Sequence, residues 1–228
     1  MTRAAALEFV PSPNTITQPV TKFGGQPVWI VEPQWPHSLQ TGNPMRFICQ
    51  IALDESIFPG EPGKMAYIFM TDEEEYVDGT WETDGGENAV IIQPGLIPGN
   101  IKTSASSVGP TLYQMAEVPG KSRLIERTCE FGVTCTALDD PDFQPADIRR
   151  AWGDGEFEKY AAALDGNKVG GTPIFLQGDE FPEGDDWRLL LQLDSTRVPF
   201  YVNFGDAGIA YAFINTKGTS GKLLWQCA

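Results

Sequence analysis

Residues 22–28 read Lys-Phe-Gly-Gly-Gln-Pro-Val, and residues 168–174 read Lys-Val-Gly-Gly-Thr-Pro-Ile. The two stretches share a lysine, an apolar residue, two glycines and a proline followed by a β-branched residue, and they are 146 residues apart. Paired glycines permit a backbone turn with positive φ, and the proline fixes the direction in which the chain leaves it. Such a segment, present twice, is typical of a duplicated structural unit.

Two further blocks repeat in the same order. Residues 45–51 (Met-Arg-Phe-Ile-Cys-Gln-Ile) align with Trp-Arg-Leu-Leu-Leu-Gln-Leu, 142 residues later, and residues 66–70 (Ala-Tyr-Ile-Phe-Met) align with Ala-Tyr-Ala-Phe-Ile, 144 residues later. The offsets differ only by short insertions and deletions. We therefore predict a single domain over residues 1–228, made of a first pseudo-repeat at about 22–70, a middle segment at about 71–165 and a second pseudo-repeat at about 166–214.

The composition favours short strands over long helices. The 228 residues include 24 glycines and 18 prolines, which mark turns, and the 41% of hydrophobic residues can fill a sizeable core. Residues 45–53 are apolar at both alternating positions, which indicates a strand covered on both faces. Strands are expected at 29–31, 45–53, 65–70, 89–93, 111–118, 172–177, 187–193, 209–215 and 222–226, and a strand or hairpin at 124–138.

The one persuasive helical stretch lies at residues 145–164. Pro145 suits a first helical turn, Gly153 and Gly155 are expected to divide residues 145–164 into two short helices, and the second helix is expected at 156–164. Residues 1–20 read as an extended lead-in with a helical turn at 3–8. The expected fold class is α+β, mainly antiparallel β: a single domain built from two pseudo-repeats, each supplying a short antiparallel sheet, with a few short helices.

The net charge of −15 narrows the range of partners. It repels nucleic acid and anionic membranes and suits a basic protein partner, although many soluble proteins are simply acidic. Residues 72–87 contain eight acidic residues and no basic one, and residues 178–186 are also acidic. Both segments are expected to be exposed loops, and neither has the ligand spacing of a calcium loop.

The cysteines and the absence of a membrane signal suggest a compartment. No stretch approaches the roughly 20 apolar residues that cross a bilayer, and residues 1–10 lack the apolar core of a signal peptide. We therefore expect a cytoplasmic protein whose four cysteines are reduced thiols. None of them lies in a Cys-x-x-Cys motif, so no metal site and no cofactor are predicted.

The repeated blocks resemble the YwqG-like family. The resemblance rests on Lys-Phe-Gly-Gly-x-Pro-x-Trp from residue 22, Trp35-Pro36, Pro-Met-x-Phe-Ile-x-Gln-Ile from residue 44, and the second Lys-x-Gly-Gly-x-Pro with Leu-Leu-Gln-Leu from residue 190. The family is similar to the domain of programmed cell death protein 2, whose relatives are chaperones of a basic ribosomal protein, and bacterial members resemble components of toxin–immunity neighbourhoods. The resemblance therefore implies protein binding.

One segment departs from the pattern of these relatives. Many of them carry Cys-x-x-Cys-Gly between the Trp-Pro and Pro-Met motifs, where this chain has Ser-Leu-Gln-Thr-Gly at residues 38–42. Hydroxyl groups are poor zinc ligands compared with thiolates. A metal knuckle of the relatives should therefore be absent here.

The candidate binding residues are amides, tryptophans and carboxylates. Gln50 and Gln192 hold the same repeat position in strands that should be buried, so each amide either binds the backbone of its Gly-Gly-x-Pro segment, which we favour, or binds a ligand. Aromatic side chains surrounded by charged residues are common at protein interfaces. The alternative is that these tryptophans pack in the core. The residues expected in such a surface are Trp35, Trp81, Trp187, Asp185 and Asp186.

No catalytic residue is predicted. His37 is the only histidine, and its neighbour Ser38 is badly placed to be its nucleophile. Residues 218–222 resemble a phosphate loop, but the first glycine of that motif is missing and too few residues follow for its helix. The first function hypothesis is a non-enzymatic protein-binding module, chaperone-like or immunity-type, that holds a basic partner. The alternative is a small-molecule-binding protein or enzyme with a pocket between the two pseudo-repeats, in which Glu126 and Glu130 could serve as acid and base.

Overall fold

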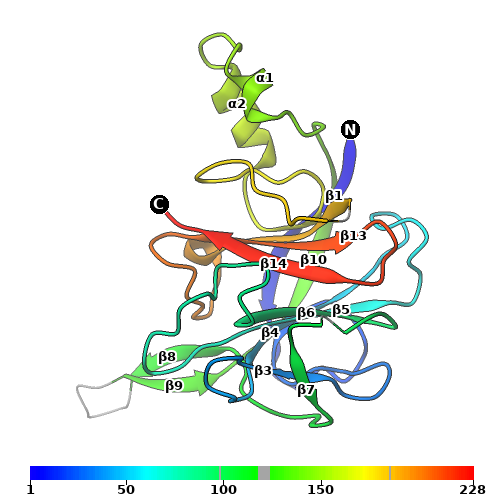
Figure 1. The fold of residues 1–228 in the computed structure, drawn as a ribbon, viewed down its shortest axis with the longest axis vertical. Helices are drawn as coiled ribbons and strands as arrows, with labels where there is room; N and C mark the ends of the chain where they lie inside the picture. Colours follow the sequence, from blue (N-terminus) through cyan, green and yellow to red (C-terminus); the bar gives the residue numbers. More distant parts are fainter. Residues whose placement is uncertain (98, 118–123, 185) are drawn as a thin grey trace.

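The computed structural model describes residues 1–97, 99–117, 124–184 and 186–228. Within these ranges ten strands close into one antiparallel barrel (Figure 1). The order of strands around the barrel is β1 (Thr2–Pro11), β10 (Glu130–Asp140), β2 (Lys22–Gly24), β4 (Arg46–Ala52), β5 (Met65–Met70), β6 (Asn88–Gln93), β14 (Gly221–Gln226), β13 (Ile209–Asn215), β12 (Trp187–Asp194) and β11 (Lys168–Gly170).

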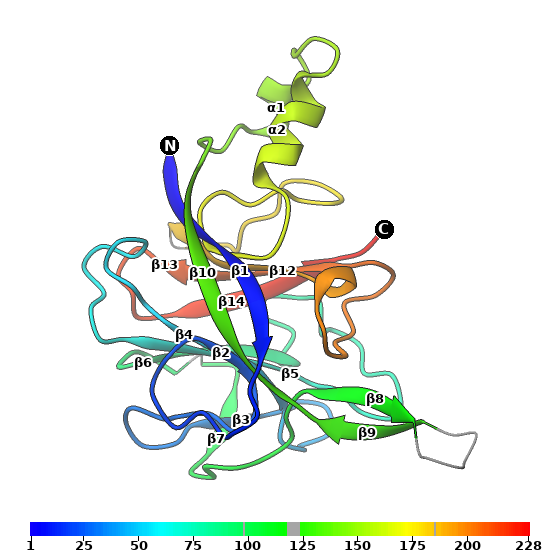
Figure 2. The same cartoon turned by 180° about the vertical axis from the view of Figure 1, so that it is seen from behind.

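A long two-stranded ribbon joins the two sides of the barrel (Figure 2). Strands β1 and β10 pair along their whole length, from Thr2 opposite Asp140 to Pro11 opposite Phe131. The outer edge of β10 pairs with β2, and the outer edge of β1 pairs with β11. On the far side the barrel closes where Gly221 on β14 pairs with Val90 on β6. The ribbon therefore supplies the broad connection between the β2–β6 strands and the β11–β14 strands.

Alternating side chains place one apolar layer inside the barrel and further layers outside it. On β5, Ala66, Ile68 and Met70 face the interior, whereas Tyr67 and Phe69 face outward. The outward layer is covered by the chain that follows β2, including Trp35 on β3 (Trp35–His37), and β3 pairs with β7 (Lys102–Ser104). A corresponding outer layer around Phe175 and Phe213 covers β12 and β13. Strands that read as apolar on both faces are thus covered on both faces.

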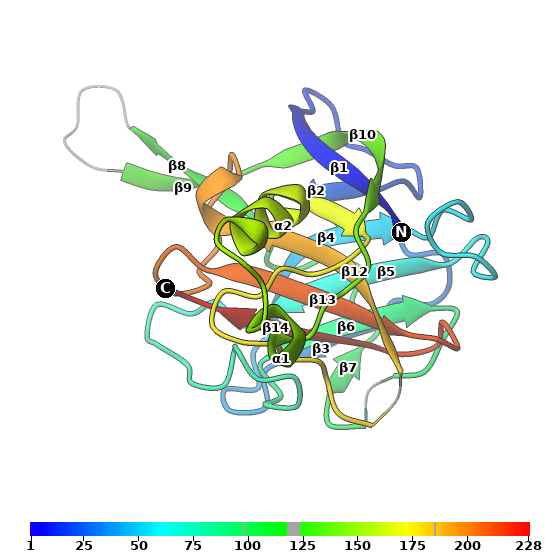
Figure 3. The same ribbon diagram turned by 90° about the horizontal axis from the view of Figure 1, so that it is seen from above.

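Two elements extend away from the barrel. The hairpin of β8 (Tyr113–Glu117) and β9 (Leu124–Thr128) projects from one side, as seen from above in Figure 3. Helices α1 (Ala146–Arg149) and α2 (Glu156–Leu164) lie at one end of the molecule, and a 3₁₀ turn occupies Ser195–Arg197. Within the described ranges no helix is long and apolar enough to span a membrane.

Much of the expected fold is confirmed. The described chain is a single, mostly antiparallel β domain with two α-helices, divided where Gly153 and Gly155 predicted. Gly155 has a φ of 80° and immediately precedes α2, a backbone conformation that glycine adopts without strain. Strands at 45–53, 65–70, 89–93, 187–193, 209–215 and 222–226 are also found, within a residue or two of the predicted bounds.

Three expectations are wrong. Residues 29–31 and 172–177 contain no strand, because their backbone N–H groups bind side chains of the sheet below instead of a neighbouring strand. Residues 2–11 form β1, so there is no helical turn at 3–8. The separate short sheets are one barrel, because the β1–β10 ribbon connects the strands that would have ended them.

Candidate functional site

Each Gly-Gly-x-Pro segment is anchored by a buried lysine. The Lys22 Nζ donates to Glu130 Oε1 at 2.5 Å and to the carbonyl oxygen of Gln26 at 2.7 Å. The Lys168 Nζ donates to Asp140 Oδ2 at 2.6 Å and to the carbonyl oxygen of Thr172 at 2.7 Å. Burial lowers the pKa of Lys168, against the opposing effect of Asp140. A charge buried this deeply requires such partners, so both lysines hold the fold together.

Gln50 and Gln192 contact the Gly-Gly-x-Pro segments through Oε1, whereas their Nε2 groups donate to carbonyl oxygens outside those segments. The Gln50 Oε1 accepts from Val28 N at 2.7 Å, and its Nε2 donates to the Val20 carbonyl oxygen at 2.8 Å. The Gln192 Oε1 accepts from Ile174 N at 3.0 Å, and its Nε2 donates to the carbonyl oxygens of Leu164 and Gly166. Both side chains are fully buried with both amide atoms bonded to backbone, the arrangement of a structural contact.

Two tyrosines and two further glutamines, which the sequence analysis did not single out, extend these contacts. The Tyr67 hydroxyl donates to the Val28 carbonyl oxygen at 2.8 Å, and the Tyr211 hydroxyl donates to the Ile174 carbonyl oxygen at 2.7 Å. Gln93 Oε1 accepts from Val31 N, and Gln226 Oε1 accepts from Gln177 N. The signal was present for the tyrosines, because Ala-Tyr occurs in both copies of the third repeated block.

Trp35 belongs to the core. Its side chain is completely buried, its Nε1 donates to the Met45 carbonyl oxygen at 2.8 Å, and its ring packs edge-on against Phe69. Trp35 therefore has no surface with which to contact a partner, in contrast to the expectation that it would be a binding residue.

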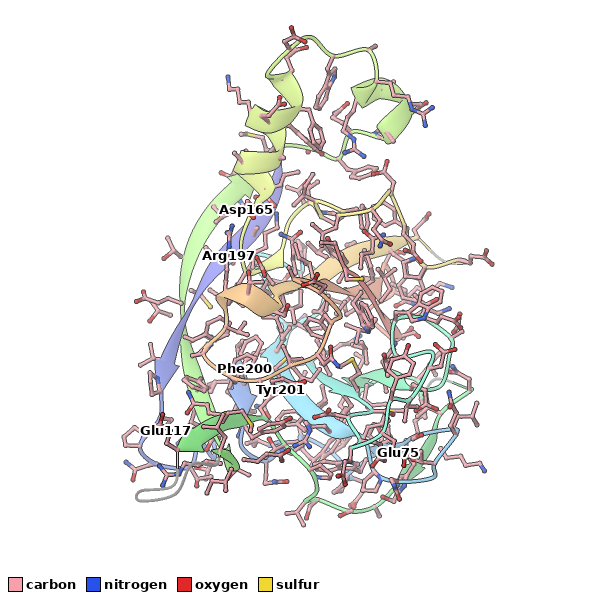
Figure 4. The ribbon with its side chains drawn as sticks, turned by 90° about the vertical axis from the view of Figure 1, so that its left-hand side faces the viewer. Glu75, Glu117, Asp165, Arg197, Phe200 and Tyr201 are labelled. Atoms are coloured by element: carbon pink, nitrogen blue, oxygen red, sulfur yellow. The ribbon has the colours of Figure 1, made fainter. Side chains whose placement is uncertain are left out.

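One acidic segment with many exposed carboxylates connects β5 to β6. This segment, residues 71–87, is called the acidic loop below. Its carboxylates Glu73, Glu74, Glu75, Asp78, Glu82 and Asp84 are exposed. Tyr76 and Trp81 lie among them with 76% and 42% of their surface exposed. In Figure 4, Glu75 of this loop lies well apart from Glu117 of the β8–β9 hairpin.

Buried polar side chains fix the conformation of the acidic loop. Glu87 is completely buried and accepts from Gln40 N at 2.9 Å and from Thr71 Oγ1 at 2.7 Å. Asn88 Nδ2 donates to the carbonyl oxygens of Thr80 and Glu82. The carbonyl oxygen of Trp81 accepts from the backbone N–H of Trp225 on β14 at 3.4 Å. Both ends and the middle of the loop are thus attached to the barrel.

A cavity of about 220 Å³ adjoins the acidic loop. Its lining includes Asp72, Glu73, Glu75, Tyr76 and Trp225. Carboxylates beside aromatic rings form an environment suited to a cationic side chain. Asp72 itself is paired with Arg46, at 2.5 Å between Oδ2 and Nε, and burial nevertheless raises its pKa.

The remaining candidate residues lie near the other end of the acidic loop. Lys222 on β14 pairs with Asp84 at 2.6 Å, and its Nζ lies 5.8 Å from the centre of the Trp187 ring. Trp187 is half-buried against the outer apolar layer of β12 and β13, and Asp186 is exposed beside it. Asp185 lies outside the described residues. Arg46 and Lys222, which are distant in sequence, therefore offset two carboxylates of a segment that has no basic residue of its own.

A known protein family matches most of the chain. Residues 21–221 match the family described as a domain of unknown function (DUF1963). The chain belongs to the DUF1963 family. A comparison with curated proteins finds no match.

In this DUF1963 member the segment at 38–42 is a hydrogen-bonded turn. Ser38 Oγ accepts from Thr41 N at 3.0 Å, and the Ser38 carbonyl oxygen accepts from Gly42 N. His37 bonds through Nδ1 to the Gly42 carbonyl oxygen and through Nε2 to Ser104 Oγ. Across the described ranges no three His, Cys, Asp or Glu side chains are grouped so that they could hold a metal ion.

The two glutamates suggested as an acid–base pair have different surroundings. Glu130 is bound to Lys22 and also accepts from Ile16 N at 3.2 Å. Glu126 is exposed on β9, in the projecting hairpin. Glu130 is therefore a structural carboxylate of the DUF1963 fold in this chain, and the exposed acidic loop is the better candidate for a functional surface.

Proposed function

We propose that this protein is a non-enzymatic protein-binding module, chaperone-like or immunity-type, that holds a basic partner protein against the acidic loop. One observation carries the proposal: Tyr76 and Trp81 stand in solvent among exposed carboxylates, on a loop whose conformation is fixed by Glu87 and Asn88. Aromatic residues such as tryptophan and tyrosine are enriched among the residues that anchor protein interfaces.

The surroundings of the anchors support a basic partner. Complementary charge accelerates association and discriminates against other acidic proteins. The 220 Å³ cavity beside the loop, with its carboxylates and the Tyr76 and Trp225 rings, is suited to a lysine or arginine side chain of that partner. Because the loop is held in place before binding, little conformational entropy is lost on association.

We also propose that the chain is a YwqG-like member of its family and is built from two related halves. Matching contacts support this relationship. Lys22 and Lys168 each bind a carboxylate of β10 and the carbonyl oxygen four residues further along the chain. Gln50 and Gln192 each accept a hydrogen bond from the backbone N–H of the residue that follows the proline of the repeated segment.

A cytoplasmic location fits this proposal. All four cysteines of the chain lie in the described ranges and are free thiols, which persist in a reducing compartment. A chaperone-like or immunity-type protein would meet a newly made or internalised basic protein in that compartment. Nucleic acid and anionic membranes are poor partners for a chain with a net charge of −15.

Affinity capture from a native cell lysate at low and high salt tests the proposal. We expect a basic protein to be retained at low salt and released at high salt, because the exposed charges are screened. Trp81→Ala should reduce the retained amount at least about tenfold, in line with loss of an interface anchor. Phe157→Ala is the matched control, since Phe157 on α2 is as exposed as Trp81.

A second pair of variants tests the role of charge. Replacing Glu73, Glu74 and Glu75 by glutamine should weaken capture and flatten its salt dependence. Replacing the exposed Glu156 and Glu158 on α2 by glutamine should leave capture unchanged. The proposal is wrong if no basic protein is retained at low salt, or if the acidic-loop variants and the α2 variants behave alike.

A further inference from the structure

On one face of the β1–β10 ribbon the side chains decrease in size from Pro11 and Phe131 to Ala5 and Ala137. Opposite residues form the pairs Pro11 and Phe131, Phe9 and Val133, Leu7 and Cys135, and Ala5 and Ala137. Phe9, Leu7 and Val133 pack against the central core, and Phe131 is part of it. Beyond Leu7 and Cys135 this face carries the methyl groups of Ala5 and Ala137, and then the Arg3–Asp139 ion pair.

The two ends of the ribbon are filled differently. At the wide end, Phe200 from the connection between β12 and β13 packs against Phe9, Phe23 and Phe131, with ring centres 5.4–5.8 Å apart. Figure 4 shows Phe200 and its neighbour Tyr201 on this connection. At the narrow end the residues after β4 approach the ribbon, but they leave a cavity of about 690 Å³. Small side chains without a compensating large one account for this space.

The walls of this cavity are mainly apolar. They include Ala5, Ala52, Ile57, Cys135, Ala137 and Val169. β10 pairs with β2 only through Glu130–Gly132, so in the described chain the strand has no neighbour on that side where Cys135 and Ala137 lie. Small-molecule sites are typically apolar cavities of this size, and in β-barrels they commonly lie at the mouth of the barrel.

Negative charge exceeds positive charge at the rim of the cavity. Arg3 is neutralised by Asp139, at 3.1 Å between Nη1 and Oδ1. Asp54 accepts from Ser56 N and Ser56 Oγ, and these hydrogen bonds lower its pKa and keep it ionised. Its charge also acts on the Cys135 thiol, whose pKa is raised by burial and by Asp54. Asp54 therefore leaves the rim with an excess of negative charge.

We propose that this cavity binds a small amphiphilic amine, with an aliphatic or aromatic body among the alanines and its ammonium group at Asp54. The apolar walls bind the body through burial of its surface, and the single uncompensated carboxylate selects a cation over a neutral or anionic head group. The site lies on other strands than the acidic loop and does not depend on the protein-binding function.

Three fluorescent probes with the same ring test the site: 1-naphthylmethylamine, 1-naphthylmethanol and 1-naphthoic acid. In titrations of the full-length protein we expect saturable binding of one amine per chain, about tenfold tighter than the alcohol, with the acid weaker still. Ala137→Leu should weaken amine binding at least about tenfold by occupying the space. Asp54→Asn should make the amine and the alcohol bind equally.

Matched variants and a second readout make the test decisive. Ala162→Leu and Asp154→Asn, both at exposed positions around α2, should leave amine binding unchanged. If Ala137→Leu unfolds the protein, Cys135→Leu fills the same space from the neighbouring position. In the wild-type protein the amine should slow modification of Cys135 by a thiol reagent several-fold, while Trp81→Ala should not alter amine binding. The proposal fails if no probe binds saturably, if Ala137→Leu and Ala162→Leu bind alike, or if the acid binds as tightly as the amine.

Discussion

Glu130 and Asp140 are the first and last residues of the same strand, β10, and each neutralises one buried lysine. Glu130 pairs with Lys22, and Asp140 pairs with Lys168. The two lysines hold the two Gly-Gly-x-Pro segments, which cover opposite parts of the barrel. The two ends of β10 therefore hold both Gly-Gly-x-Pro segments in place.

The first prediction concerns these ion pairs. Asp140→Asn leaves the Lys168 charge buried without a compensating charge and should lower the free energy of unfolding by about 3–5 kcal/mol. Urea unfolding followed by tryptophan fluorescence measures the change. Asp139→Asn is the control, because Asp139 makes an exposed pair with Arg3 that contributes at most about 1 kcal/mol. Equal losses in the two variants would contradict the role given to Asp140.

The second prediction concerns Gln50. Gln50→Leu leaves Val28 N and the Val20 carbonyl oxygen without their partner inside the protein. Each unsatisfied group costs about 1–3 kcal/mol, so the unfolding midpoint in urea should fall clearly. Gln177→Leu, which removes only a hydrogen bond from an exposed side chain, should change stability by less than about 0.5 kcal/mol. A Gln50→Leu protein of normal stability that lost partner capture would show that this amide binds the partner.

The third prediction concerns Gly171. This residue has a φ of 80°, and a Cβ atom there would collide with Asp140 Oδ2, the oxygen that binds Lys168. Gly171→Ala should therefore destabilise the fold by about 2–4 kcal/mol, through backbone strain and displacement of the carboxylate. Gly178→Ala is the control, because nothing lies within 4 Å of a Cβ atom at Gly178. Thermal unfolding of both variants compares them, and similar midpoints would argue against the close contact.

The fourth prediction concerns alkaline pH. Burial raises the pKa of Tyr67 to about 12, from an ordinary value of 10.0. Between these values the unfolded chain loses the phenol proton and the folded protein keeps it, so stability should fall as pH rises from about 10 to 12. Tyr67→Phe should lower stability at pH 8 by about 1–2 kcal/mol through its lost hydrogen bonds, and should reduce the slope above pH 10 by up to about 1.4 kcal/mol per pH unit.

Urea unfolding at a series of pH values measures both effects of Tyr67→Phe. Tyr201→Phe serves as the control, because its side chain is 42% exposed, and its stability at pH 8 should be within about 0.5 kcal/mol of the wild type. An unchanged slope above pH 10 in Tyr67→Phe would show that the buried phenol is not the group that titrates.

Local patterns predicted those features that depend on neighbours in sequence. The double apolar faces of β4 and β12 identified central strands, and Gly153 and Gly155 located the break between the helices. The contacts of Gln50 followed from its place in a buried strand beside a repeated turn. Among the expected binding residues, Trp81 is exposed, whereas Trp35 is buried, a difference that composition alone does not reveal.

Other features depend on contacts between distant segments. Lys22 meets Glu130 across 108 positions of sequence, and no spacing rule connects them. β1 contains three successive alanines, which have low strand preference, so its conformation is set by pairing with β10. The cavity beside Ala5 and Ala137 arises because two small residues are placed opposite each other by that pairing.

The position of β10 has a consequence for synthesis of the chain. The first lysine segment leaves the ribosome more than a hundred residues before its carboxylate, so an emerging chain cannot bury Lys22 in its final place. Until Glu130 emerges, β2 cannot pair with β10, so the strands from β2 to β6 expose an unpaired edge. The segment that follows Lys22 also packs poorly on these strands, because the Lys22 charge has no partner. Release of a chain truncated before residue 130 would therefore yield a fragment prone to aggregate or to be degraded rather than a smaller stable domain.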